Sequence, residues 1–262
     1  MCLLGAVALP STAGATIGAV TTNGAASPTP LNGSTPSGVS LSFGFDATYS
    51  GGFSPGPSLV VFHFDNDIAF DTTGLPQCAP ASLAGLTTAQ ALAICGPAKV
   101  GSGTVIYNGG SINGVITAFN GTPGKSYDRV VLHLVLDAGP AIDLIGELGP
   151  SSRGGDFGTE LNVPGWPNNP GLAPTHFAVT LDNLEPAPGH YYVSAGCSDA
   201  DHTLNFAADF AYHDATTGSA SATQVCAPPP TGRRAAALKK CKKKNSKKAR
   251  KKCRIKANRL PL

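Results

Sequence analysis

The segment His63-Phe64-Asp65-Asn66-Asp67 holds one imidazole and two carboxylates at alternate positions. Alternate side chains of a β-strand point to the same face, so His63, Asp65 and Asp67 would form a row able to hold a hard cation such as calcium. The alternative is the solvated face of a half-buried strand. We adopt this alternative because the glycine and distal glutamate of a calcium-binding loop are missing, and we expect neither a metal nor another cofactor.

A second polar segment, Cys197 to His202, lies between two predicted strands. Asp199 and Asp201 could ligate a metal, and Ser198 with His202 has the side chains of a hydrolytic pair. Ser198 is not in a Gly-x-Ser-x-Gly elbow, and Asp and Ser are ordinary turn residues. We therefore interpret this segment as a structural turn and assign no catalytic residue.

The strongest chemical signal is the distribution of charge. Residues 1–232 contain four of the nineteen basic residues and all sixteen acidic ones, a formal charge of −12, whereas residues 233–262 carry +15. Such an arm attracts polyanions over a long range, and salt weakens the attraction. The alternative is that the cations only keep the terminus solvated. The predicted contact residues are Lys239, Lys240, Lys242, Lys243, Lys244, Lys247, Lys248, Arg250, Lys251, Lys252, Arg254, Lys256 and Arg259.

The elements that must position these residues are mainly strands. Apolar residues alternate with polar or small ones, and clusters of Gly, Pro, Asn and Asp separate the runs. This pattern predicts an all-β fold, an antiparallel β-sandwich of about eight to ten strands. The clearest strands are 41–45, 130–136, 177–181 and 204–212, together with 60–70, which is either one longer strand or a bent pair of strands. Further candidates are 98–107, 112–119, 141–148, 190–196 and 219–225.

One short helix interrupts the strands, and cysteines bracket it. Thr87 and Gln90 have the spacing of a capping box, and Gly96-Pro97 ends the run. Six cysteines follow the first residues of the chain and allow fifteen complete pairings, among which the spacing favours the three sequential ones. These are Cys78 with Cys95, Cys197 with Cys226, and Cys241 with Cys253.

The basic tail has two possible forms. On one straight helix Cys241 and Cys253 would lie about 18 Å apart, too far for a disulfide. A bond between them therefore requires a helical hairpin, and without it the tail is a fluctuating basic strand or helix.

The chain divides into five predicted segments. Residues 1–15 read as a secretory signal peptide whose start can lie further upstream, and 16–38 as a flexible lead-in. The sandwich domain covers 39–227, a proline-rich linker 228–232 and the basic tail 233–262. No run reaches the eighteen or so apolar residues of a membrane-spanning helix.

Two parts of the sequence resemble secreted bacterial proteins. The turn Leu75-Pro76-Gln77-Cys78, the second Cys95 and then Val100-Gly101-Ser102-Gly103 look like a Leu-Pro-x-Cys, Cys, Val-Gly-x-Gly pattern of such proteins. The tail from Leu238 to Pro261 is similar to a Lys- and Cys-rich ending found on many of them. The resemblance implies export and a β-rich body, and it assigns no activity.

These features predict a non-enzymatic protein, secreted or at the cell surface, whose tail binds anionic envelope polymers or extracellular polyanions, nucleic acid only non-specifically. The rival hypothesis is an extracellular hydrolase or carbohydrate-binding module that uses the surface near His63 or Trp166. Trp166 is the only tryptophan and could stack on a sugar from an exposed loop, although an amphipathic tryptophan more often anchors a loop. A third possibility is that the tail folds back onto the acidic body.

Overall fold

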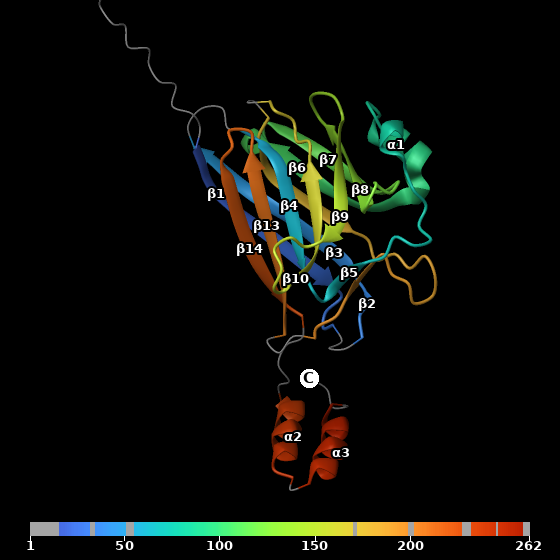
Figure 1. Cartoon of the computed structure of the whole chain (residues 1–262), viewed down its shortest axis with the longest axis vertical. Helices are drawn as coiled ribbons and strands as arrows, with labels where there is room; N and C mark the ends of the chain where they lie inside the picture. Colours follow the sequence, from blue (N-terminus) through green and yellow to red (C-terminus); the bar gives the residue numbers. More distant parts are fainter. Residues whose placement is uncertain are drawn as a thin grey trace, which may run out of the picture.

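The computed structural model describes residues 16–31, 35–50, 55–169, 172–198, 202–226, 232–244 and 246–258. The predicted signal peptide and most of the linker lie outside this part of the chain. The described residues form fourteen strands and three α-helices (Figure 1). Their bounds are β1 Thr16–Ser27, β2 Ser37–Gly38, β3 Ser40–Ser50, β4 Pro57–Asp65, β5 Ile68–Phe70, α1 Thr88–Cys95, β6 Lys99–Tyr107, β7 Ile112–Gly121, β8 Asp128–Leu136, β9 Ile142–Pro150, β10 Phe157–Pro164, β11 Pro174–Leu181, β12 Val193–Ala195, β13 Thr203–Tyr212, β14 Thr217–Val225, α2 Gly232–Lys242 and α3 Lys247–Ala257.

Eleven strands form one antiparallel sheet in the order β1-β3-β11-β6-β7-β8-β9-β10-β4-β13-β14. The sheet folds over so that its two halves face each other. Phe43 on β3 and Phe62 on β4 meet in the interior with ring centroids 5.0 Å apart. The two sheet edges also meet, because the Gln224 amide of β14 donates to the Ala26 carbonyl of β1 (3.0 Å) and accepts from the Ala26 N–H (2.7 Å). The predicted antiparallel sandwich is confirmed.

The segments with the strongest alternating patterns form the core strands of the sandwich. On β3, Leu41, Phe43 and Phe45 point inward and are at most 2 % exposed. The corresponding residues of β8, β11 and β13 are buried in the same way. Burying one such side chain contributes about 1.5–3 kcal/mol, which explains why the period-two pattern locates these strands correctly.

The expected flexible lead-in is wrong for residues 16–27, because they form the edge strand β1, paired along its length with β3. Its inward positions carry small side chains, which hide the hydrophobic alternation. Gly24 shows why they must be small: a Cβ atom there would lie 2.1 Å from the Phe206 ring. The strand count of eight to ten was too low for two reasons. The strands β1, β10 and the two-residue β2 lack a strong alternating pattern, and the predicted run 60–70 is divided into β4 and β5.

The predicted helix is α1, and its capping box is present. The Thr87 hydroxyl accepts from the Gln90 N–H (3.4 Å), and the Gln90 side chain accepts from the Thr87 N–H (2.9 Å). The disulfide Cys78–Cys95 joins the two ends of the insertion. Leu83 and Ala91 of this insertion pack with outward-facing residues of β7 and β8 in a second, smaller core. Helix α1 therefore lies outside the sandwich, against β7 (Figure 1).

A small sheet of β2, β12 and β5 lies at one end of the sandwich. The disulfide Cys197–Cys226 joins the segment after β12 to the end of β14. All three sequential disulfides are therefore present, with Cα–Cα distances of 5.5, 5.7 and 5.5 Å. Disulfides of this kind form and persist in oxidising compartments, outside the cytosol.

Candidate functional site

The basic tail is a closed helical hairpin. Helices α2 and α3 pack side by side, and the disulfide Cys241–Cys253 joins them. Ser246 begins α3, where its hydroxyl accepts from the Ala249 N–H (3.1 Å). Cys241 and Ala257 are buried between the helices at 1 and 3 % exposure. Helices of eleven residues are marginal alone in water, so the crosslink and this small interface stabilise the pair.

The predicted contact residues of the hairpin are exposed wherever the structure describes them. The hairpin contains no acidic residue, and none of the ion pairs among the described residues involves the tail. The third possibility, a tail paired with its own acidic body, therefore has no ion pair to support it in the described chain. Arg259 lies outside the described residues; Lys239, Lys240, Lys242, Lys243, Lys244, Lys247, Lys248, Arg250, Lys251, Lys252, Arg254 and Lys256 are all exposed.

Charge density makes α3 unusual. It places seven cations on eleven residues, over about 16 Å of helix axis. Pairs such as Lys247 with Lys251, and Lys248 with Lys252, stand four residues apart on one face, where like charges repel. Because no carboxylate of the described residues forms an ion pair with them, these charges are balanced by mobile counterions. A polyanion can replace those counterions and release them.

The row at His63 is not solvated, so this expectation is wrong. His63 and Asp65 are 1 and 0 % exposed. His63 Nε2 donates to Asp209 Oδ2 (3.0 Å) from β4 to β13, and in the neutral ring Nδ1 accepts from the Ser151 hydroxyl (2.9 Å). Ser151 follows β9, so the chain between β9 and β10 passes over the outer face of β4. This covering excludes water from His63, although the side chain points away from the core.

The three residues of the row serve different partners. The Asp65 carboxylate accepts from the backbone N–H groups of Asp67 (2.9 Å) and Asn205 (2.8 Å). The Asp67 carboxylate accepts from the N–H and, at 2.6 Å, from the hydroxyl of Ser198. Within the described residues no group of three or more His, Cys, Asp or Glu side chains could hold a metal ion.

Ser151, His63 and Asp209 have the order of a hydrolytic triad, but the surroundings oppose that chemistry. A serine nucleophile needs backbone N–H groups free to stabilise an oxyanion. The Ser152 N–H, next to the would-be nucleophile, instead donates to Glu160 (2.7 Å). The Glu160 carboxylate also lies 3.5 Å from His63 Nδ1, where its charge would repel an oxyanion. The arrangement anchors the segment after β9 to the sheet.

The other two sequence candidates also have structural explanations. Trp166 is 3 % exposed, its indole N–H donates to the Val163 carbonyl (3.0 Å), and its ring packs against Phe177. It anchors a loop and presents no stacking platform. In the segment Cys197 to His202, the Ser198 hydroxyl donates a hydrogen bond to the Asp67 carboxylate. Residues 199–201 lie outside the described part of the chain.

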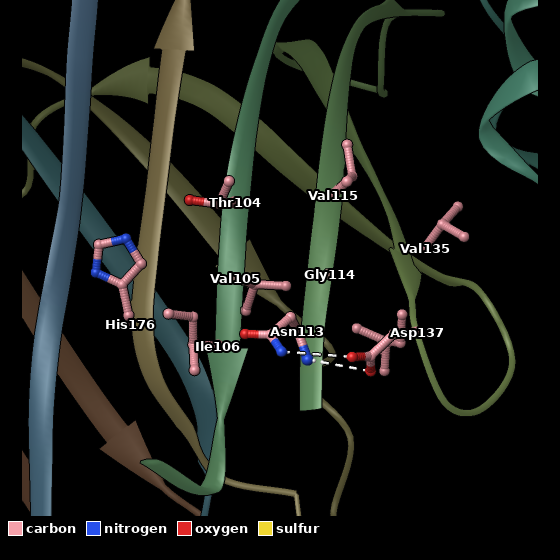
Figure 2. Close-up of a pocket in the computed structure, with 10 residues that line it drawn as sticks. Thr104, Val105, Ile106, Asn113, Gly114, Val115, Val135, Asp137 and His176 are labelled. Carbon is pink, nitrogen blue, oxygen red and sulfur yellow. Dashed lines mark hydrogen bonds between the residues drawn. The ribbon is translucent and has the colours of Figure 1, made fainter. Parts of the chain in front are cut away.

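A groove of about 550 Å³ lies on the outer face of β6, β7 and β8 (Figure 2) and was not predicted from the sequence. Its apolar floor is formed by Ile106, Val115 and Val135, and Val115 is 52 % exposed. Asp137 lies at one end and His176 at the other. The signal in the sequence was an apolar residue at outward positions of neighbouring strands, which single-strand alternation does not reveal.

None of the helices in the described part of the chain has both the length and the apolar character needed to cross a membrane. Comparison of the chain with protein-family models, with curated proteins and with solved structures finds no match.

Proposed function

We propose that this is a non-enzymatic, exported protein of the cell envelope whose basic helical hairpin binds anionic polymers. One observation carries the proposal: the described cations from Lys239 to Lys256 are all exposed and have no carboxylate partner. The three disulfides support export, because such bonds persist in oxidising compartments.

The chemistry of the hairpin favours charge over sequence or shape as the recognised feature. Most cations of α3 are lysines, whose flexible side chains present point charges. The tail contains no aromatic residue that could stack on bases. Wall phosphates, acidic polysaccharides, anionic lipid headgroups and extracellular DNA all offer suitable repeated anions. Nucleic acid would be bound without sequence preference.

The sandwich carries a net charge of the opposite sign. Its formal charge of −12 repels the polymer that the hairpin attracts. The hairpin is therefore the contact element, and the β-domain stays on the solvent side of the polymer. The rival hypothesis of a hydrolase or sugar-binding module loses both of its nominated residues, because His63 and Trp166 are buried.

The salt dependence of binding to inorganic polyphosphate tests the proposal. Replacing Lys251 and Lys252 by Gln removes two hairpin cations, so the log–log slope of affinity against salt should fall by about 1.4, at about 0.7 per contact of a single-stranded polyanion. Replacing Lys99 and Lys125 by Gln removes two body cations and should leave the slope unchanged. Equal effects of the two double variants would overturn the assignment to the hairpin.

Cell fractionation tests the envelope association. Removing residues 233–262 should shift the protein from the envelope to the medium, because the acidic body has no attraction of its own for anionic polymer. Retention of the shortened chain on the envelope at the same ionic strength would place the recognition surface on the β-domain instead.

A further inference from the structure

The groove on β6, β7 and β8 is built from two neighbouring rows of side chains. In one row, Thr104 pairs with Val115, and Val115 with Val135, across β6, β7 and β8. In the other, Ile106 pairs with Asn113 across β6 and β7. The first row contributes two valines and the second an isoleucine, so an apolar patch lies in the middle of the sheet face.

Carboxylates flank this patch on both sides. Toward β8, Asp137 accepts from the Asn113 backbone N–H (3.1 Å) and side chain (3.4 Å). Toward β3, Asp46 accepts from His176 Nδ1 (2.7 Å), and its side chain remains 57 % exposed. Each carboxylate lies two strand spacings from Ile106, about 10 Å, because neighbouring strands are about 4.8 Å apart.

The hairpin carries a surface that matches this arrangement. Ile255 on α3 is 51 % exposed, an unusual position for an isoleucine among so many cations. Lys251 and Lys248 precede it by four and seven residues and therefore share its helix face. At a rise of about 1.5 Å per residue, Lys248 lies about 10 Å along the helix from Ile255. An apolar residue with an ammonium group at this spacing fits the groove in either direction.

We infer that the groove binds the hairpin of a second copy of the chain, with Ile255 on the apolar patch and Lys248 or Lys251 toward Asp46 or Asp137. Charge complementarity favours this occupant, since the body carries −12 and the tail +15. Because the groove and the hairpin are different surfaces, the contact is head-to-tail, and it can repeat from copy to copy. The inference does not depend on polyanion binding.

Sedimentation equilibrium of the full-length protein tests the inference. The average mass should rise with protein concentration in about 0.05 M salt and return to that of the monomer in about 0.5 M salt, where charges are strongly screened. Val115→Lys should weaken association about tenfold or more, since it places an ammonium group on the apolar patch. Ile255→Gln should weaken it through the other surface.

Each variant has a matched control. Val225, on β14, is 57 % exposed, and Ile94, on α1, is 58 % exposed, so both resemble the tested residues while lying outside the groove and the hairpin. Val225→Lys and Ile94→Gln should associate like the wild type. If the controls weaken association as much as Val115→Lys and Ile255→Gln do, the specific contact is wrong.

Mixing the two blocked proteins gives the decisive result. The Val115→Lys protein keeps an intact hairpin and the Ile255→Gln protein keeps an intact groove. At a concentration where each protein alone is monomeric, their mixture should therefore form one-to-one dimers. A wild type that stays monomeric at every concentration would overturn the inference, whether its hairpin folds onto its own body or the groove takes another ligand. Both variants keep all tail cations and should bind polyphosphate normally, so the outcome is separate from the test of the proposed function.

Discussion

Some side chains that point away from the core of this sandwich are nevertheless buried. His63 on β4 and His133 on β8 both occupy outward positions and are 1 and 0 % exposed. Each has a carboxylate partner, Asp209 for His63 (3.0 Å) and Asp143 for His133 (2.7 Å). Burying a polar side chain costs free energy unless it is hydrogen-bonded, so the carboxylate on the other strand stabilises each imidazole.

Asp65 gives the clearest test at this scale. Asp65→Asn replaces an acceptor oxygen by a donor NH₂ group against the N–H of Asp67 or Asn205, and should lower the free energy of unfolding by about 1.5–3 kcal/mol, the range for hydrogen bonds to charged groups. Chemical denaturation measures this. Asp156→Asn, at an exposed aspartate, should change stability by no more than about 0.5 kcal/mol. Equal small effects would show that Asp65 is solvated after all.

At the scale of elements, the sandwich depends on an edge strand with hardly any large side chains. Val20, Thr22, Gly24 and Ala26 lie at alternate positions of β1 and are more buried than the residues between them. The strand is held mainly by its ladder with β3 and by the amide of Gln224 on β14, and its larger apolar residues Ile17 and Val20 are only partly buried. Close contact with Phe206 leaves room only for hydrogen at Gly24.

Overpacking at Gly24 should therefore be costly. Gly24→Val directs new methyl groups at the Phe206 ring and should destabilise the protein by about 1–3 kcal/mol. The adjacent Asn23→Val places the same side chain on the exposed face of the strand and should be close to neutral. Thermal denaturation of the two variants makes the comparison. If both melt like the wild type, residues 16–27 are a dispensable lead-in and do not belong to the fold.

At the scale of the molecule, the core contains tyrosine hydroxyls with no hydrogen-bond partner in the described chain. Tyr107, Tyr192 and Tyr212 are such residues. Burial raises the pKa of Tyr212 to about 12, and the nearby Asp214 charge adds to the effect. Burial also raises the pKa values of Tyr107 and Tyr192. The folded state therefore holds these phenols in their neutral form.

This predicts sensitivity to alkali. An unfolded tyrosine has a pKa of about 10, so above that pH the unfolded chain loses protons that the folded chain retains. Stability is complete below about pH 10 and falls as the pH rises toward 12. Tyr212→Phe removes one such group and should raise stability in this window while changing it little at neutral pH, as denaturation at the two pH values would show. An unchanged alkaline profile would mean that Tyr212 ionises in the folded state.

Local patterns in the sequence determined much of this protein. The alternation in β3, β8, β11 and β13 reflects one buried face per strand, and the capping box of α1 acts within four residues. The separation of charge between body and tail follows directly from the order of the residues in the sequence. The requirement that a Cys241–Cys253 bond bends the tail into a hairpin follows from the rise of a helix alone.

Tertiary structure decided what depends on distant neighbours. The pairing of the cysteines had fifteen solutions until the fold brought three pairs within bonding distance. His63 was predicted to face water because its strand alone cannot show that the chain after β9 covers it. The strand Thr16–Ser27 was missed because its small residues are required by packing against Phe206, which is far along the chain. The groove exists only through the register of β6, β7 and β8, since burial and contact depend on what lies opposite a side chain in space.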